Sequence, residues 1–290
     1  MQSSASTVER PIGQTASISW ALLKFLLGRI NRLLKWPFYK LYEHRLSKAA
    51  LRWARPEHIG IILDGNRRFA RQWGLSSLIA GHSIGADKLD EVLNWCFEYN
   101  VPCATIWIFS LDNFDRDPEE VKGLLDLIET RTRKMLQDPR IRDNKIRLRY
   151  MGRLDLLPDS LREAIADIEE TTKDHDQFLL NVAIAYGGRE EITDAFRQYL
   201  TDQQAAGKAL EDILPTLDAD SIKPFLYTSG LPDPDLIIRT SGEVRLSGFL
   251  LWQSAYAEYY FCDTFWPDFR KIDFLRALRS YHLRQRRFGR

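Results

Sequence analysis

Cysteine is scarce in this chain: its 290 residues include only Cys96, Cys103 and Cys262, and no pair of them is spaced as CxxC. This excludes a disulfide framework and a zinc-binding pattern, so we expect a protein of the reducing cytosol. Long apolar runs are missing too. The uncharged stretch 11–23 holds few strongly apolar residues and is followed by Lys24, whereas a membrane-spanning helix needs about 20 apolar residues. No small-residue cleavage site follows it, which argues against a signal peptide.

The chain has almost no net charge, +1, but its two ends differ in charge. Residues 1–55 carry ten Lys/Arg and two acidic residues, a net charge of +8. The remainder holds 31 of the 41 basic and 38 of the 40 acidic residues, a net charge of −7. We therefore predict a basic N-terminal segment, residues 1–55, joined at Arg55-Pro56 to a main domain, residues 56–290. The acidic main domain argues against a nucleic-acid-binding protein.

The N-terminal segment contains an amphipathic basic helical pattern. Two interpretations remain open. The helix lies on an anionic membrane, with Trp20 and Trp36 at the interface, which would make the protein peripheral on the inner, cytoplasmic face. Alternatively, it packs on the main domain or on a partner subunit. The apolar positions are Leu22, Leu23, Leu26, Leu27, Ile30, Leu33 and Leu34, and the basic positions include Lys24, Arg32 and Lys35.

In the main domain, short apolar runs alternate with longer segments of helical spacing. This predicts an α/β fold: a mostly parallel central sheet of about six strands, flanked by helices and covered on both faces. In such sheets ligands bind at the carboxyl ends of the strands. Residues 203–220 are expected to form a flexible linker. The expected strands are residues 58–63, 102–109, 145–151, 178–185 and 235–239, and the expected helices are residues 85–99, 118–137, 157–172, 189–204 and 272–287.

The most informative segment is an apolar run, residues 59–63, that leads directly into Asp64-Gly65-Asn66-Arg67-Arg68. The glycine lets the backbone approach a ligand closely, and the asparagine and arginines supply donors for phosphate oxygens. A carboxylate beside arginines suits a metal diphosphate, because the carboxylate takes Mg²⁺ and the arginines take the remaining negative charge. An isolated Asp-Gly-Asn is more often a plain turn with solvated arginines, so other segments must decide.

Three further segments place polar residues directly after predicted strands: residues 109–116, residues 186–189 and residues 239–247. In the last of these, Arg239 and Arg245 stand six apart across a glycine-containing turn, as in a second anion site. Two diphosphate sites in one cleft suggest that two phosphorylated substrates are joined, whereas a hydrolase needs only one.

Taken in order, these segments closely resemble the cis-prenyltransferase family, which includes undecaprenyl and dehydrodolichyl diphosphate synthases. The resemblance covers roughly residues 58–289 and rests on HIGIILDGNRRFA, GHSIGADKL, FSLDNFDR, YGGRE, DLIIRTSGEVRLSGFLLWQSAYAEYYF, WPDF and RFG. The DGNRRFA form is similar to archaeal and eukaryotic members. The resemblance implies repeated condensation of isopentenyl diphosphate onto an allylic diphosphate, farnesyl or geranylgeranyl diphosphate, with Mg²⁺ as cofactor. The product would be a Z-polyprenyl diphosphate, the precursor of a glycosyl carrier lipid.

The resemblance also implies roles for individual residues. Asp64 would hold Mg²⁺ and help the allylic diphosphate to leave, with Glu258 as the second metal carboxylate. Asn113 matches the position assigned to proton removal, but an amide is a poor base, so we expect it to position the substrate. The residues expected to bind substrate are Gly65, Asn66, Arg67, Arg68 and His82 at the allylic diphosphate, Arg239, Arg245 and Ser247 at isopentenyl diphosphate, and Ser110, Phe114 and Arg116, with Asn113, between the two substrates. Phe69, Leu111, Asp112, Leu246, Arg287 and Gly289 of the same motifs complete the expected substrate-binding set.

Two interpretations of His82 stay open: a diphosphate ligand, or a residue that caps the helix it opens. The tryptophans Trp107, Trp252 and Trp266 are expected in the core rather than in the site. His282 is expected to be structural.

The chain end, Arg287-Phe288-Gly289, matches the R-x-G ending that in family members working alone reaches the partner subunit's isopentenyl diphosphate. Catalytic subunits of the two-subunit eukaryotic enzymes lack this ending, and their accessory subunits have it without the acidic site. This chain has both, which implies an active homodimer. The alternative, a non-catalytic scaffold subunit of a heteromeric prenyltransferase, conflicts with Asp64 and Asn113.

Two features bear on the details of the site. Ser77 stands where many members have an arginine for the allylic diphosphate, so Arg67 or Arg71 would have to replace it. An apolar tunnel between the sheet and the helices would hold the growing chain. The bulky residues Phe178 and Ile108 are expected near its far end, where they would favour a shorter or medium product.

Overall fold

The computed structural model describes residues 39–284. The chain divides into two compact units, residues 1–49 and residues 50–290, and each is described by itself. In the first unit, residues 39–49 are helical. The amphipathic pattern at 22–35 and the ending with Arg287 and Gly289 lie outside the described residues. Within the described part, no helix combines the length and the apolar character that crossing a membrane requires.

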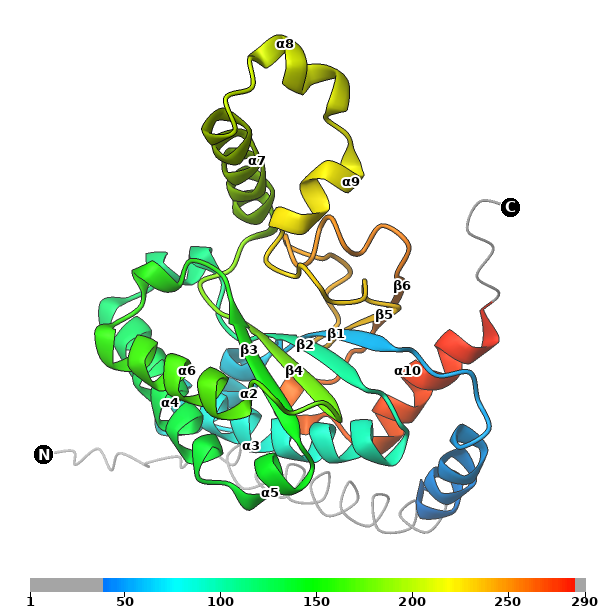
Figure 1. Ribbon diagram of the computed structural model, residues 1–290. Helices are drawn as coiled ribbons and strands as arrows, with labels where there is room; N and C mark the ends of the chain where they lie inside the picture. Colours follow the sequence, from blue (N-terminus) through cyan, green and yellow to red (C-terminus); the bar gives the residue numbers. More distant parts are fainter. Residues whose placement is uncertain (1–38, 285–290) are drawn as a thin grey trace, which may run out of the picture. The chain divides into compact units, whose positions relative to one another are not determined.

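The second unit is built on one sheet of six parallel strands in the order β3-β4-β2-β1-β5-β6 (Figure 1). β1 lies between β2 and β5, and Ile62 at its end pairs with Trp107 and with Arg239. The carboxyl ends of these three strands therefore lie level, and the predicted parallel α/β sheet is confirmed. The sixth strand, β6, is a short, half-buried edge strand that the apolar pattern did not predict. The strands are β1 His58–Ile62, β2 Cys103–Trp107, β3 Ile146–Met151, β4 Phe178–Ala183, β5 Leu236–Arg239 and β6 Glu258–Phe261.

One layer of helices covers one face of the sheet: α6 contacts α4, α4 contacts α3, and α3 contacts α2 and α10. The other face takes its cover from an irregular segment, in which Phe249 and Leu250 pack against Ile62 and Ile237. The helices are α2 Asn66–Gln72, α3 Leu78–Glu98, α4 Pro118–Leu136, α5 Pro139–Asp143, α6 Asp159–Thr172, α7 Gly188–Ala205, α8 Leu210–Ile213, α9 Ala219–Ile222 and α10 Lys271–Leu283, with 3-10 turns η1 Leu111–Asp115, η2 Leu154–Leu156, η3 Leu214–Thr216, η4 Lys223–Phe225 and η5 Trp266–Asp268.

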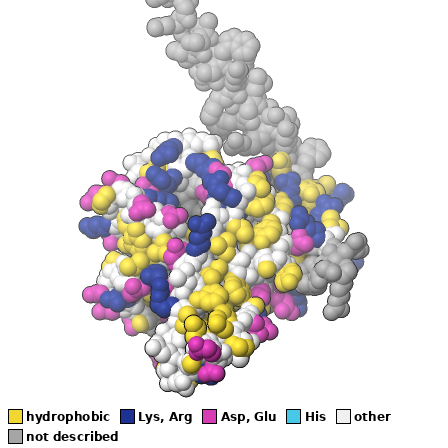
Figure 2. All heavy atoms as spheres, turned by 90° about the horizontal axis from the view of Figure 1, so that it is seen from above, with side chains coloured by type: hydrophobic (Ala, Val, Ile, Leu, Met, Phe, Trp, Pro, Cys, Tyr) yellow, Lys and Arg dark blue, Asp and Glu magenta, His cyan; other side chains and the backbone are white. Residues whose placement is uncertain are grey.

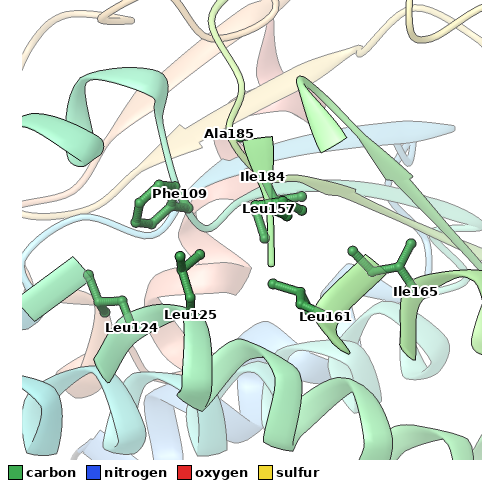
Figure 3. Close-up of a cluster of buried hydrophobic side chains, with 8 residues drawn as sticks. All are labelled: Phe109, Leu124, Leu125, Leu157, Leu161, Ile165, Ile184 and Ala185. Atoms are coloured by element: carbon green, nitrogen blue, oxygen red, sulfur yellow. The ribbon is translucent and has the colours of Figure 1, made fainter. Parts of the chain in front are cut away.

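A cluster of buried apolar side chains joins the helix layer to the chain just beyond β2 and β4 (Figure 3). Phe109, 1% exposed, belongs to this cluster and directly precedes Ser110. Burying such a ring contributes about 2–3 kcal/mol, so the core fixes the point at which the polar residues after β2 begin. The cluster consists of Phe109, Leu124, Leu125, Leu157, Leu161, Ile165, Ile184 and Ala185.

Residues 203–220, expected as a flexible linker, instead form the end of α7, then α8, η3 and the start of α9. The expectation is wrong because apolar residues are spaced through this polar stretch. Ile213 and Ile222 are buried with Ala195 and Tyr199 of α7 in a separate small core. Figure 1 shows α7, α8 and α9 rising from the carboxyl end of the sheet.

Candidate active site

A cavity of about 330 Å³ opens at the carboxyl ends of β1, β2 and β5. Figure 2 shows the molecule from above, with Lys and Arg side chains in several patches that acidic and apolar side chains separate. The cavity brings together eleven of the residues predicted from sequence: Asp64, Gly65, Asn66, Arg67, Arg68, His82, Ser110, Asn113, Arg116, Arg239 and Ser247.

Asp64 lies between two arginines that come from different strand ends. Its Oδ2 accepts a hydrogen bond from Nη2 of Arg239 at 2.7 Å, and its Oδ1 accepts one from Nη2 of Arg68 at 3.3 Å. Its backbone carbonyl accepts hydrogen bonds from the Thr240 hydroxyl at 2.7 Å and from the Trp266 amide at 3.0 Å. Backbone and side chain are therefore both held in place.

The surroundings of Asp64 keep it ionised. Burial raises the pKa of this carboxyl, but the hydrogen bond and charge of Arg239, together with smaller contributions from Ser241 and Arg68, outweigh burial and leave the pKa below its usual value. At neutral pH the side chain is a carboxylate, the form that a hard cation such as Mg²⁺ requires.

Two glycines allow the chain to pack closely around Asn66, the first residue of α2. Gly65 has φ +107°, and a Cβ there would lie 2.8 Å from the Phe265 ring. On α3, a Cβ at Gly85 would overlap Oδ1 of Asn66. The glycines of the GHSIG motif therefore let α3 lie directly against the start of α2, which places His82 beside the cavity.

Arg68 connects the loop after β1 to the loop after β5. Besides its contact with Asp64, its Nη2 donates to Oγ of Ser241 at 2.6 Å, and its Nη1 pairs with Glu243 at 3.0 Å. The ion pairs at this site thus run continuously from Arg239 through Asp64 and Arg68 to Glu243.

The position that lacks the expected arginine has a local structural role. Ser77 is the N-cap of α3, and its Oγ accepts a hydrogen bond from the Ala80 amide at 3.1 Å. Arg67 and Arg71, the two candidates to replace the missing guanidinium, both line the cavity. A nearby guanidinium is therefore available without residue 77.

His82 lies inside α3, after the Ser77 cap, so the helix-capping interpretation is wrong. Its Nε2 is buried and has no hydrogen-bond partner among the described residues. Burial, followed by the charges of Arg116 and Arg67, lowers the pKa of His82 to about 4. The ring is therefore neutral at pH 7, and its Nε2–H tautomer can donate to a phosphate oxygen.

Arg239 is 4% exposed and rigidly held, because its Nη1 donates to Oγ of Ser247 at 2.8 Å while its Nη2 binds Asp64. Ser247 has φ +53°, so the loop turns back toward the arginine there. Arg245, the other arginine of the predicted second anion site, has a side chain 61% exposed, pairs with Glu243, and lies outside the cavity lining. One chain thus contributes one of these two arginines to the cavity.

Asn113 closes the turn after β2. Its side-chain Oδ1 accepts a hydrogen bond from the backbone amide of Ser110 at 3.0 Å, and the backbone amide of Asn113 donates to the Ser110 carbonyl at 3.0 Å. With Oδ1 occupied, the side chain offers Nδ2 as a donor to a ligand. This geometry agrees with a positioning role rather than a base.

Six predicted substrate contacts do not line the cavity. Phe69 is buried against Trp73, and Leu111 and Phe114 pack on the core cluster of Figure 3. Their apolar side chains gain more by burial than by facing a charged cavity. These six predicted substrate contacts are Phe69, Leu111, Asp112, Phe114, Arg245 and Leu246.

Glu258 and Asp64, predicted together as metal carboxylates, are not brought together within one chain. Glu258 begins β6 and pairs with Leu236 at the amino end of β5, whereas Asp64 follows the carboxyl end of β1. Glu258 forms an ion pair with Arg284. The register of the sheet therefore separates the two carboxylates. Among residues 39–284, no group of three or more His, Cys, Asp or Glu could enclose a metal by itself.

A second cavity, of about 100 Å³, continues from the first between the sheet and helices α3 and α4. Its walls are mostly apolar, and it shares Leu63, Asn66, His82 and Ile108 with the first cavity. This agrees with the predicted apolar tunnel. For Ile108 the expectation of a place near the far end is wrong, because this residue lies at the junction of the two cavities. Phe178 packs on Phe97 at the amino end of the sheet, two residues before Leu180 of the cavity wall, so its place near the far end stays a prediction.

Sequence reasoning missed the aromatic part of the site. Trp107, expected in the core, lines the cavity and stacks on Phe249. Trp266 is fully buried and Trp252 packs on the core of α7–α9, as expected for both. Trp107 ends β2 directly beside Ile62, so its position at a strand end was the available signal.

Residues 62–289 match the model of a family described as undecaprenyl diphosphate synthases. An isoprenyl transferase of Thermus thermophilus is 51% identical over 88% of this chain and 96% of that protein. The (2Z,6E)-farnesyl diphosphate synthase of Thermobifida fusca is 53% identical over 89% of this chain and 99% of that protein. The crystal structure of lavandulyl diphosphate synthase from Lavandula x intermedia, in complex with dimethylallyl diphosphate, is 32% identical, with a TM-score of 0.76, over 81% of this chain and 99% of that chain.

Proposed function

Because the chain belongs to the undecaprenyl diphosphate synthase family, it is a cis-prenyltransferase, and we propose that the cavity beside Asp64 is where it joins isopentenyl diphosphate to an allylic diphosphate. One observation carries this assignment: the ionised Asp64 lies between Arg68 and Arg239, which reach it from different strand ends. Such an arrangement suits two anionic substrates bound on either side of one carboxylate. The primer would be farnesyl or geranylgeranyl diphosphate, and the product a Z-polyprenyl diphosphate that serves as a glycosyl carrier precursor.

On the allylic side, Arg67, Arg68 and His82 face the leaving diphosphate. When the allylic C–O bond breaks, negative charge grows on that diphosphate, and fixed donors stabilise it without reorganising. Asp64 fits a Mg²⁺ ligand, because Mg²⁺ is commonly held by one or two carboxylates together with substrate phosphates. When bound there, the ion would neutralise part of the developing charge.

On the other side, Arg239 and Ser247 would hold the diphosphate of isopentenyl diphosphate. Its terminal alkene carbon then forms the new C–C bond with the allylic C1, and a proton leaves C2. Asn113 would orient this substrate through Nδ2, while diphosphate or water accepts the proton. The apolar second cavity would take the growing hydrocarbon chain.

The test is to incubate the purified protein with isopentenyl diphosphate, Mg²⁺ and allylic primers of different length, and to size the products. We expect elongation that needs both substrates and disappears in Asp64→Ala. Absence of elongation with every primer would refute the proposal and favour a scaffold subunit of a heteromeric enzyme. Full activity of Asp64→Ala would refute the role of this residue.

We further propose that the active form is a homodimer in which Arg287 and Gly289 complete the partner's site. Mixing Asp64→Ala and Arg287→Ala chains tests this, because a mixed dimer then has one intact site. Random assortment predicts recovery of about a quarter of the native activity. No recovery after subunit exchange, or a monomer in sedimentation analysis, would contradict the dimer.

For the basic N-terminal segment we propose a peripheral contact with an anionic membrane on the cytoplasmic side. The full chain should sediment with vesicles containing phosphatidylglycerol, and lose this binding at high salt. A chain lacking residues 1–38 should stay in solution. If the full chain binds the vesicles no better than the chain lacking residues 1–38, the segment does not add membrane binding, and packing of the segment on the protein is favoured instead.

A further inference from the structure

Glu120, in the first turn of α4, contacts two arginines of the cavity although it does not line the cavity itself. Its Oε1 accepts a hydrogen bond from Nη1 of Arg116 at 3.1 Å and lies 3.2 Å from Nε of Arg67. Only 10% of the Glu120 side chain is exposed. Because Arg67 belongs to α2 and Arg116 precedes α4, one carboxylate oxygen joins two separate elements.

The two arginines need such a partner. Burial is the largest cause of the lowered pKa of Arg116, and the nearby charge of Arg67 lowers it further. Both arginines also lower the pKa of His82. Two guanidinium groups that repel each other would separate if no anion lay between them. Glu120 supplies that anion in the protein itself.

The contact with Glu120 leaves the useful donors of Arg67 open. Glu120 approaches the Nε edge, and the Nε–H is not aligned for a hydrogen bond, so the contact is an ion pair. The terminal nitrogens of Arg67 have no partner among the described residues. This pair of parallel donors matches a phosphate group.

We propose that Glu120 is a positioning residue for the allylic diphosphate: it holds Arg67 and Arg116 together so that both guanidinium groups meet the same diphosphate. The proposal rests on the proposed function for the identity of the ligand. Two effects of Glu120 oppose each other. Its charge repels a diphosphate, and its contacts arrange the arginines that bind one. Positioning requires the second effect to dominate.

The substitution Glu120→Gln keeps the size of the side chain and removes its charge. We expect KM for the allylic substrate to rise about three- to tenfold, because the ion pairs are partly exposed. KM for isopentenyl diphosphate and kcat should stay unchanged. The matched control is Glu119→Gln, an exposed residue of the same helical turn that makes the same change of charge without touching either arginine.

A second measurement does not depend on turnover. Titration calorimetry with inorganic diphosphate should show weaker binding by Glu120→Gln, unchanged binding by Glu119→Gln, and partial recovery in Glu120→Asp. Unchanged or tighter binding by Glu120→Gln would overturn the proposal. If the native protein binds diphosphate but elongates no primer, the proposed function fails while this test still decides the role of Glu120. Thermal unfolding curves identify any variant that is merely misfolded.

Discussion

Two buried histidines lie at opposite ends of the parallel strands: His58 at the amino ends and His82 at the carboxyl ends, which we call the amino edge and the carboxyl edge of the sheet. They differ in the hydrogen bonds that their rings make. At the amino edge, Nδ1 of His58 donates to the Pro232 carbonyl at 2.7 Å, and its Nε2 accepts from the Thr105 hydroxyl at 2.7 Å. At the carboxyl edge, Nε2 of His82 is buried without a partner in the described part of the chain. Burial is the first cause of a lowered pKa in both.

Burial and a shifted pKa therefore do not separate a structural histidine from one in a site. Unmet hydrogen-bonding capacity does, since buried polar groups are normally paired. The charged surroundings differ as well: the His58 ring lies near the carboxylates of Asp235 and Asp233, whereas His82 lies near the guanidinium groups of Arg67 and Arg116. The amino edge is built for stability, and the carboxyl edge is built for a ligand.

The largest effect should come from the carboxyl edge, at Asp64. Asp64→Asn keeps the shape and removes the charge that, under the proposed function, would hold Mg²⁺, so we expect kcat to fall about 10³-fold or more, a loss of roughly 4 kcal/mol of transition-state stabilisation. Initial rates with both substrates saturating measure this. A decrease in kcat of less than tenfold, with the circular dichroism spectrum unchanged, would mean that the carboxyl edge depends less on the charge of Asp64 than we infer.

Arg239 tests whether the carboxyl edge needs a guanidinium rather than any positive charge. Arg239→Lys cannot reach Asp64 and Ser247 at once, so we expect KM for isopentenyl diphosphate to rise about 100-fold. KM for the allylic substrate should change much less. Equal increases in both constants would place Arg239 between the substrates rather than on one side.

At the amino edge the effect should fall on stability alone. His58→Leu leaves the Pro232 carbonyl and the Thr105 hydroxyl without their partner, which should lower the free energy of unfolding by about 2–3 kcal/mol. Urea denaturation measures this loss. Activity per folded molecule should stay at the native level. A large decrease in kcat of the folded variant would contradict the conclusion that the amino edge serves stability alone.

The smallest expected effect is a dependence of stability on pH. Because the folded state lowers the pKa of His82 from 6.5 to about 4, the unfolded chain binds more protons below pH 6.5, and stability falls as the pH decreases. Between about pH 7 and pH 5 the contribution is about 2 kcal/mol.

His82→Gln should remove this contribution while weakening diphosphate binding severalfold. Denaturation at pH 7, 6 and 5 gives the comparison with the native chain. Identical pH dependence of the two proteins would show that His82 is not held neutral by the fold.

Much of the sequence interpretation depended on one rule, that ligands bind at the carboxyl ends of parallel strands. Asp64, Ser110 and Arg239 each follow an apolar run, and the fold brings all three to one cavity. The rule failed for Phe69 and Leu111, which lie in the same motifs but face the core. A motif gives the order of residues along the chain, whereas a helical or 3-10 turn decides which of them turn inward.

The sequence by itself determined the class of fold, the family and the loops that carry the chemistry, because these depend on local periodicity and on residue types in a fixed order. Only the tertiary structure decided which residues meet. It separated Glu258 from Asp64 through the register of the sheet, and it joined Arg67 to Glu120 across two helices. It also left Nε2 of His82 without a hydrogen-bond partner among residues 39–284. Such outcomes depend on distances between segments far apart in the chain, which no local pattern records.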